Sequence, residues 1–124
     1  HESGLAGIIA TNTTIDRSVL KRDPGEQGGI SGQPLLTKAQ DFMREIAGQC
    51  APEMTLIGVG GLFTGQDFLA RLQAGAHLLQ VYSGWVYGGP QMPARALLEL
   101  LEAMEQAGIG SVPETWATAR TNPE

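Results

Sequence analysis

The segment that decides the fold is "IGVGGLFTGQDFLARLQAGAHLLQVYSGW", residues 57–85, in which one helix-like stretch separates two short apolar runs. The runs, residues 54–59 and 77–81, have the continuous apolar pattern of strands in a parallel sheet. Small residues follow each run, namely Gly60, Gly61, Ser83 and Gly84. A strand, a helix and a second strand in this order are typical of a parallel sheet with helices packed outside it.

The stretch between the two runs carries helix signals at both of its ends. Thr64 and Asp67 have the spacing of a capping box, and Gly75 stands where the helix would end. The side chains between them share one apolar face, formed by Phe68, Leu69 and Leu72. This pattern predicts a helix that begins after Thr64 and packs against the sheet.

Similar signals extend in both directions along the chain. Residues 5–10, "LAGIIA", predict a strand that is buried on both faces. After a long polar loop, residues 11–34, a helix is expected over residues 35–47, with Gly48 as its left-handed end. A last helix is expected over about residues 93–106, with an apolar side formed by Leu97, Leu98, Leu101 and Met104.

Three strand–helix units predict an α/β fold, about half of an eight-unit (β/α)8 TIM barrel, which as a whole takes about 250 residues. We expect residues 1–107 to form this partial barrel and residues 108–124 to form a loosely ordered tail. An open three-stranded sheet would expose unpaired edges, so we expect self-association or a missing partner segment. Because the first residue is His1 rather than Met, we expect a piece of a longer protein.

Composition and charge narrow the class of protein. At 124 residues, 42% hydrophobic and 17% charged, the chain has the size and composition of one globular domain. A net charge of −5 with scattered Lys and Arg argues against nucleic acid as a partner. The single Cys50 excludes an internal disulfide, and no apolar stretch approaches the about 20 residues of a transmembrane helix. No metal site is expected, because His77 has no second histidine nearby.

Glycine at the ends of consecutive strands is the signal of a candidate phosphate site. In eight-fold barrels the loops after the last two strands commonly bind phosphate, because glycine lets backbone N–H groups point at the anion. Gly60 and Gly61 end one strand, and after the next strand the Ser83 hydroxyl adds a further donor. The same glycines would also suit tight strand-to-helix turns, and their spacing alone leaves both interpretations open.

Polar residues after the first strand and aromatic residues after the third are further candidates. Asn12 lies between two threonines in "ATNTT", and its amide offers a donor and an acceptor to a ring with adjacent N–H and C=O groups. Such residues also serve ordinary turns and helix caps. Apolar bulk on the loop after the third strand would line a pocket or cover a helix end; it comes from Tyr82, Trp85, Val86 and Tyr87.

Five motifs occur together in one order: "GIIATNTT", "GGISGQPL", "IGVGGLFTGQD", "AGAHLLQVYSG" and "YGGP". In this order and spacing they resemble the C-terminal part of dihydroorotate dehydrogenase, over nearly everything from Gly4 to Leu101. The resemblance is greatest to class 2, the membrane-associated, quinone-linked enzymes of pyrimidine synthesis, because of "SGQPL", "GVGG" and the aromatic-rich "YSGWVYGGP". It implies that the chain carries about the last three βα units of a (β/α)8 barrel.

The resemblance also implies a cofactor and a reaction. FMN would be the cofactor, and the residues that match its contacts are Thr11, Gly32, Gly61, Tyr82 and Ser83. In such enzymes dihydroorotate loses a hydride to the flavin and a proton to a base, which gives orotate. Quinone then accepts the electrons.

Substrate and quinone contacts are implied in the same way. Asn12 and Thr13 match the pair that binds the pyrimidine ring of orotate. Residues that match positions near the quinone tunnel are Tyr82, Trp85, Val86 and Pro90. Trp85 stands where many relatives have a smaller aliphatic residue, so the resemblance leaves the quinone preference open.

Other parts of the family's site have no match in this chain. The serine base, the lysine near the flavin, the first substrate-binding segments and the membrane-docking N-terminal helices would all lie upstream. We therefore expect no catalytic residue here, weak FMN binding and no turnover by the isolated chain. The whole enzyme would lie peripherally on the cytoplasmic side of the cell inner membrane, through a segment absent here.

Two alternatives to an enzyme piece are open. The first is a non-catalytic half-barrel that binds a phosphate or a flavin and self-associates to close its sheet. The second is a different FMN barrel enzyme, such as a class 1 relative, which the motifs named above disfavour.

Overall fold

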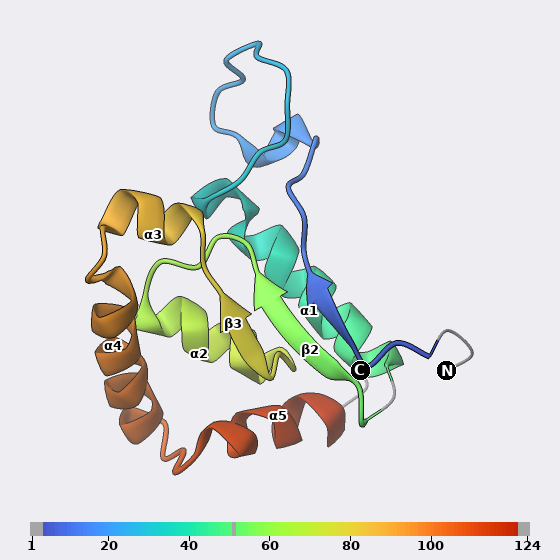
Figure 1. Ribbon diagram of the computed structural model, residues 1–124, viewed down its shortest axis with the longest axis vertical. Coiled ribbons are helices and arrows are strands. Elements are labelled where there is room, and N and C mark those ends of the chain that lie inside the picture. Colours follow the sequence, from blue (N-terminus) through green and yellow to red (C-terminus); the bar gives the residue numbers. More distant parts are fainter. Residues whose placement is uncertain (1–3, 51, 122–124) are drawn as a thin grey trace.

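The computed structural model describes residues 4–50 and 52–121, and Figure 1 shows how their helices and strands are arranged. The strands are β1 (Gly7–Ala10), β2 (Thr55–Val59) and β3 (Leu78–Gln80). The α-helices are α1 (Leu36–Gln49), α2 (Gly65–Gln73), α3 (Ser83–Gly88), α4 (Met92–Gln106) and α5 (Val112–Thr121). Two short 3-10 helices, η1 (Arg17–Val19) and η2 (Gln33–Leu35), lie in the loop between β1 and α1.

The three strands form one parallel sheet in the order β1-β2-β3. Ile9 pairs with Ile57, and Ile57 pairs with Leu78, so consecutive strands are neighbours in space. This confirms the predicted α/β class with parallel strands. It also brings the carboxyl ends of all three strands to one edge, on the side of α3 and the long loop (Figure 1).

The two faces of the sheet have different surroundings. Leu56 is completely buried, in a core cluster that includes Met43 and Ala47 of α1. On the opposite face, Ile9 is 61% exposed and Leu78 is 57% exposed, because no described layer covers them. The prediction of strands buried on both faces is therefore wrong for the described residues. The apolar runs correctly indicate parallel strands, but only one face has a helical cover.

Helix α2 forms as the sequence predicts. The Thr64 hydroxyl accepts the N–H of Asp67, and the Asp67 carboxylate accepts the N–H of Thr64, which confirms the capping box. Glu99 of α4 accepts a hydrogen bond from the N–H of Gly65 at 2.8 Å, so this acidic residue ties α4 to the start of α2. Gly75 has the expected positive φ of 107°.

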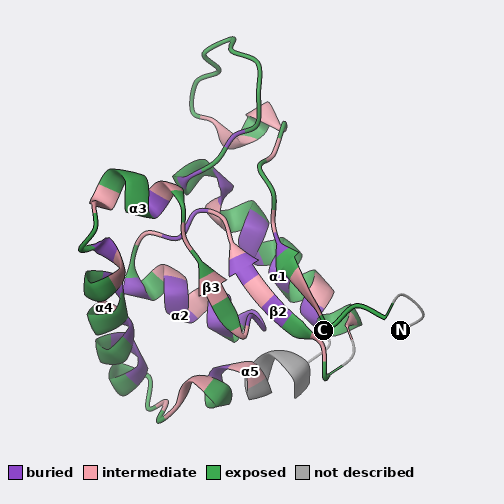
Figure 2. Cartoon of the chain, in the orientation of Figure 1, coloured by how far each residue is buried: buried purple, intermediate pink, exposed green. Residues whose placement is uncertain are grey.

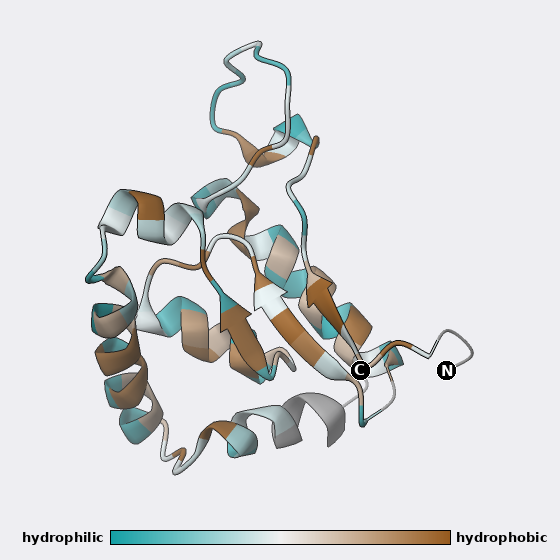
Figure 3. Ribbon diagram, in the orientation of Figure 1, coloured by the Kyte–Doolittle hydropathy of each residue, from teal (hydrophilic) through white to brown (hydrophobic). Residues whose placement is uncertain are grey.

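The ends and faces of two other helices differ from the predictions. Helix α1 continues past Gly48 to Gln49, and Cys50 closes it in an extended conformation, so Gly48 is not a left-handed end. Helix α4 buries Met104 as expected. The predicted apolar side of α4 is otherwise wrong, since Leu97, Leu98 and Leu101 are all more than half exposed. Figure 3 shows that hydrophobic residues recur along α4. The small residues Ala96 and Ala103 face α2 instead, because they allow close approach.

Two segments predicted as irregular are helical. Residues 82–91 contain α3, and the tail predicted to be loosely ordered contains α5, which packs against α1 and α2. Glu114 accepts the N–H of Gly110 at 3.1 Å and the hydroxyl of Ser111 at 2.9 Å, so it caps the start of α5. Proline in the first turn of a helix is tolerated, which explains why the proline content of the tail is misleading.

The loop between β1 and α1 extends away from the body of the molecule and is mostly exposed (Figure 2). A backbone bridge between Thr14 and Ile30 holds its base together. Arg17 donates hydrogen bonds to the carbonyl oxygens of Glu26 and Gly28, at 2.7 and 3.0 Å, across the loop. None of the described helices has both the length and the apolar character needed to cross a membrane.

Candidate functional site

A cavity of about 400 Å³ lies at the carboxyl ends of the three strands. This volume is in the range of small-molecule sites. Residues from all three strand ends and from η2 line it: Ile9, Thr11, Asn12, Thr13, Ser31, Gly32, Leu35, Val59, Gly60, Gly61, Leu62, Gln80, Val81, Tyr82, Ser83 and Gly84. The structure thus brings all seven predicted cofactor and substrate residues together around one cavity. Three of them follow β1 and two follow β3. Gly61 follows β2, and Gly32 immediately precedes η2.

The first wall of the cavity follows β1 and carries the side chain of Asn12, whose amide nitrogen has no hydrogen-bond acceptor among the described residues. The N–H of Thr11 donates to the carbonyl of Val59 at 3.0 Å, which ties this segment to the end of β2. The peptide bond that precedes Thr11 is cis. The side-chain oxygen of Asn12 accepts the N–H of Thr13 at 2.8 Å. The amide nitrogen of Asn12 donates to no described residue, so it is available to a ligand in the cavity.

The second wall is the turn at Gly60 and Gly61, which follows β2. Their φ angles are 108° and 74°, a region that side-chain-bearing residues rarely adopt. A Cβ added at Gly61 would lie 2.5 Å from the Cα of Leu36, so α1 packs directly behind the turn. The pairing of Val59 with Gln80 turns the Gly60 N–H toward β3, whereas within residues 4–50 and 52–121 the Gly61 N–H donates no hydrogen bond. The Gly61 N–H is therefore free to bind an acceptor.

The third wall joins the end of β3 to the segment before η2. The hydroxyl of Ser83 donates to the hydroxyl of Ser31 at 3.2 Å, which closes the cavity between two segments far apart in sequence. Gly32, at φ 74°, has its Cα beside Ser83, because an added Cβ would lie 3.6 Å from the Ser83 Cβ. Tyr82 is 73% exposed at the rim.

No side chain in the lining carries a charge, so the cavity offers neutral donors only. Backbone N–H groups and hydroxyls of this kind bind phosphate oxygens and the polar edges of rings. The described residues contain no group of three or more His, Cys, Asp and Glu side chains placed to hold a metal ion. The arrangement is thus suited to an uncharged ring with a phosphate.

A charged pair lies outside the cavity, at the foot of the long loop. Lys38 donates to the Asp16 carboxylate at 2.8 Å, and Ser18 donates to it through its hydroxyl and its N–H. These bonds, the one from Lys38 first, hold the pKa of Asp16 well below its usual range. The pair anchors the loop to α1.

Sequence reasoning missed three residues in or behind the site. Ser31 and Gln80 line the cavity, and Arg71 lies behind the Gly60–Gly61 turn. Gln80 had a signal, because it is a polar residue within the apolar run "HLLQV". Ser31 lies within the motif "GGISGQPL", but neither its contact with Ser83 nor the place of Arg71 had a signal, since both depend on segments that meet only in the folded chain.

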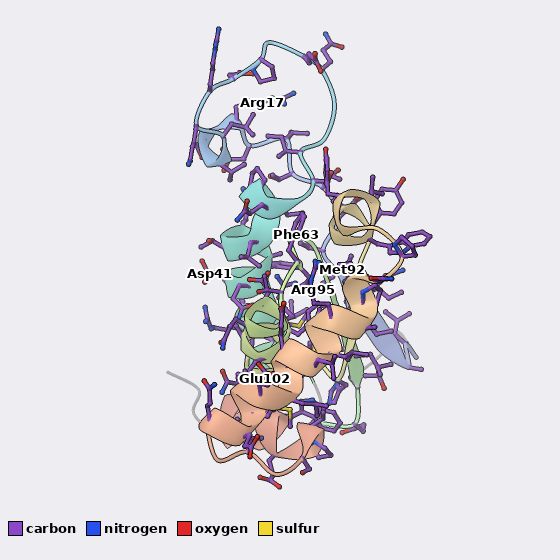
Figure 4. The ribbon with its side chains drawn as sticks, turned by 90° about the vertical axis from the view of Figure 1, so that its left-hand side faces the viewer. Arg17, Asp41, Phe63, Met92, Arg95 and Glu102 are labelled. Carbon is purple, nitrogen blue, oxygen red and sulfur yellow. The ribbon has the colours of Figure 1, made fainter. Side chains whose placement is uncertain are left out.

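The aromatic segment after β3 lies mostly outside the cavity. Trp85 and Val86 of α3 are 51% and 60% exposed and are not among the lining residues, and Pro90 is exposed as well. Figure 4 shows the neighbouring Met92 and Arg95 at the start of α4, with Phe63 above them in this view. The apolar surface of α3 therefore faces outward, next to the rim residue Tyr82.

Comparisons with known proteins agree with one another. The family model for dihydroorotate dehydrogenase matches residues 1–104. Dihydroorotate dehydrogenase (quinone) of Gloeobacter violaceus is 46% identical over 108 residues, which cover 87% of this chain and 31% of that protein. The protein of the same name from Thermus thermophilus is 47% identical over 111 residues, which cover 89% of this chain and 32% of that protein.

A solved structure gives the same result for the fold. Ligand-free DHODH from Eimeria tenella matches with a TM-score of 0.87 and 36% identity, over 94% of this chain and 33% of that chain. The chain spans about a third of the length of the relatives that it matches. The names of the curated relatives confirm the resemblance to the quinone-linked class. The chain belongs to the dihydroorotate dehydrogenase family.

Proposed function

We propose that the chain is the FMN-phosphate-binding portion of a dihydroorotate dehydrogenase (quinone), which oxidises dihydroorotate to orotate in pyrimidine biosynthesis. One observation carries the proposal: seven residues chosen from four of the sequence motifs line a single cavity at the carboxyl ends of parallel strands. In such a sheet this edge is the usual place for a ligand.

The cavity fits FMN through its neutral donors. The free N–H of Gly61 and the hydroxyl of Ser83 would bind the phosphate, and Tyr82 would cover it at the rim. Thr11 and Gly32 would contact the rest of the cofactor from the other two walls. FMN, when bound, supplies the acceptor for the substrate hydride.

Asn12 and Thr13 would bind the pyrimidine ring of the substrate. The amide nitrogen of Asn12 can donate to a ring carbonyl, while its oxygen is held by the N–H of Thr13. A fixed amide of this kind orients the ring relative to the cofactor. We assign no catalytic base within this chain; the serine base of the family would come from an upstream segment, and the isolated 124 residues would not turn over.

The open face of the sheet supports a larger (β/α)8 barrel. Ile9 and Leu78 are exposed on that face, and the relatives are about three times as long as this chain. In this proposal residues 1–107 supply the last three βα units, and residues 108–124 follow them as a tail. A non-catalytic flavin-binding half-barrel, whose open faces meet in self-association, would bury the same apolar residues.

Quinone would be the electron acceptor, as in the names of the relatives. The exposed aromatic residues of α3, next to the cavity rim, are suited to an apolar ligand. We place the whole enzyme peripherally on the cytoplasmic side of the cell inner membrane, where quinone is available.

Three measurements on the purified natural protein test this proposal together: intact mass, absorbance in the flavin band, and dihydroorotate-dependent reduction of a quinone. A mass well above that of these 124 residues, a yellow colour and turnover would support the proposal. Turnover by a protein of these 124 residues alone would contradict the assignment of the base to an upstream segment. A matching mass with flavin but no turnover would favour the self-associated half-barrel.

A further inference from the structure

Arg71 of α2 is a completely buried cation behind the cavity wall. Its guanidinium donates to the carbonyl oxygens of Val59 at 3.1 Å and Gly60 at 3.0 Å, and to that of Leu36 at 3.4 Å. It also donates to the side-chain oxygen of Gln40 at 2.8 Å. One side chain thus joins the end of β2 to the first turns of α1.

No described carboxylate forms an ion pair with Arg71. Asp67, one turn earlier on α2, accepts hydrogen bonds from the N–H groups of Phe63 and Thr64 instead. Burial lowers the pKa of Arg71 to about 10, so the side chain still carries its charge at neutral pH. The Asp67 carboxylate attracts this charge without pairing with it, and the groups that Arg71 binds directly are all neutral acceptors.

The Gly60 carbonyl that Arg71 holds decides where the next N–H group points. In a planar trans peptide the C=O of one residue and the N–H of the next point in opposite directions. Because the Gly60 carbonyl points back at Arg71, the N–H of Gly61 points away from it, while the Val59 carbonyl is shared with the N–H of Thr11. Gly61 lines the cavity, and its N–H lacks a partner within the described residues.

The surroundings of Arg71 leave room for this arrangement and hold it in place. A Cβ at Gly58 would lie 2.6 Å from the Cγ of Arg71, so only glycine lets the side chain pass beneath the sheet. The amide nitrogen of Gln40 donates to the carbonyl of Ala70, which fixes the side-chain oxygen that Arg71 binds.

We propose that Arg71 is a positioning residue for phosphate recognition: it orients the Gly60–Gly61 turn and places a fixed positive charge behind it. This rests on the proposed function, because the phosphate is taken to be that of FMN. The cavity has no charged lining residue of its own, so Arg71 supplies the positive charge next to the anion without touching it. A dianionic phosphate is then recognised without a lysine or arginine in the cavity.

The test compares FMN with riboflavin, which lacks the phosphate, by flavin fluorescence titration of the natural protein and its variants. R71M should weaken FMN binding by about tenfold or more and leave riboflavin binding within about twofold. R71K keeps the positive charge but loses the planar fork that reaches all four acceptors, so its FMN affinity should lie between those of R71M and the unmodified protein. R44M, at an exposed arginine paired with Asp41, is the matched control and should change neither affinity.

An equal loss of FMN and riboflavin affinity in R71M would mean that Arg71 only supports the fold, which would overturn the inference. If R71M does not fold, R71Q decides, since its neutral amide can still reach one carbonyl. R71Q should lower the ratio of FMN to riboflavin affinity by about threefold or more, and an unchanged ratio would overturn the inference.

Failure of the proposed function gives a different result. If the unmodified protein does not bind FMN, inorganic phosphate becomes the probe, and the backbone ¹⁵N–¹H resonances of Gly60 and Gly61 are the readout. Shifts on phosphate addition that R71M abolishes would support the role of Arg71 even then. No shift in the unmodified protein would overturn it.

Discussion

Glycine is dense in two stretches of the chain, but its surroundings differ between them. At residues 58–61 an added Cβ would lie 2.6 Å from Arg71 at Gly58 and 2.5 Å from Leu36 at Gly61. At the tip of the long loop an added Cβ on Gly25 or Gly28 would meet nothing within 4 Å. The first stretch uses glycine for close packing beside the cavity, whereas Gly25 and Gly28 at the loop tip serve only the backbone conformation. Glycine content alone therefore does not identify a site.

The largest effect that would sharpen this contrast is expected for Gly61→Ala. The added Cβ overlaps the backbone of Leu36, and the residue would keep a φ of 74° only under strain. We expect the free energy of unfolding to fall by about 3 kcal/mol and FMN binding to be lost. Urea denaturation of the natural protein and of the variant measures the change in the free energy of unfolding. Fluorescence titration measures the loss of FMN binding. If G61A lowers the free energy of unfolding no more than G25A does, the proposed difference between the two glycine stretches is wrong.

The next effect separates residues that reach the ligand from glycines that shape the backbone. Asn12→Ala removes the free amide donor without disturbing packing, so orotate affinity should fall about tenfold while FMN affinity and stability stay unchanged. Ser83→Ala is the matched control, because Ser83 is assigned to the phosphate of FMN. It should lower the affinity for FMN and leave the affinity for orotate unchanged. Isothermal titration with each ligand measures both. Equal losses of both ligands in N12A would argue against its assignment to the substrate.

A smaller effect is expected at the loop tip. Gly25→Ala adds a methyl group in open space, and only the positive φ of 74° disfavours it. The free energy of unfolding should therefore fall by about 1 kcal/mol or less, with unchanged FMN affinity. Urea denaturation checks this beside G61A. A loss of FMN binding in G25A would mean that the loop tip belongs to the site.

The smallest effect concerns pH and the anchor of that loop. The folded pKa of Asp16 lies below its unfolded value, so its contribution is present above about pH 4 and is lost as pH falls through the folded value. Limited proteolysis of the loop should accelerate in the acid range, and K38M should abolish this pH dependence. Loop cleavage that is independent of pH in the unmodified protein would argue against the anchor.

The local features of the fold were predictable from sequence. The three strands, the capping box of α2 and its buried face depend on residues close together in the chain, so their patterns are visible there. The apolar side of α4 was not, because the stripe of exposed leucines at 97, 98 and 101 has the same spacing as a core. Helix α5 was missed although its start has a local signal, because Ser111 and Glu114 have the spacing of a capping box; the helix lacks a clear apolar stripe, and its proline is typical of loops.

The residues of the candidate site likewise fall into those that were predictable from sequence and those that were not. Seven residues were assigned from motifs, and the shared edge of a parallel sheet explains why they meet in one cavity. Whether they bind FMN and orotate is still a prediction. Ser31 and Arg71 were missed because each acts on a segment distant in sequence, Ser83 for the first and the end of β2 for the second. Such contacts leave no periodic or local signal.

One measurement tests the central claim, a phosphate-binding turn at the end of β2, most directly. The natural protein is titrated with FMN and with riboflavin under the same conditions, and the two dissociation constants are compared. We predict that FMN binds at least about tenfold more tightly, because the free N–H of Gly61 and the Ser83 hydroxyl engage its phosphate. Equal affinities for FMN and riboflavin would contradict the claim.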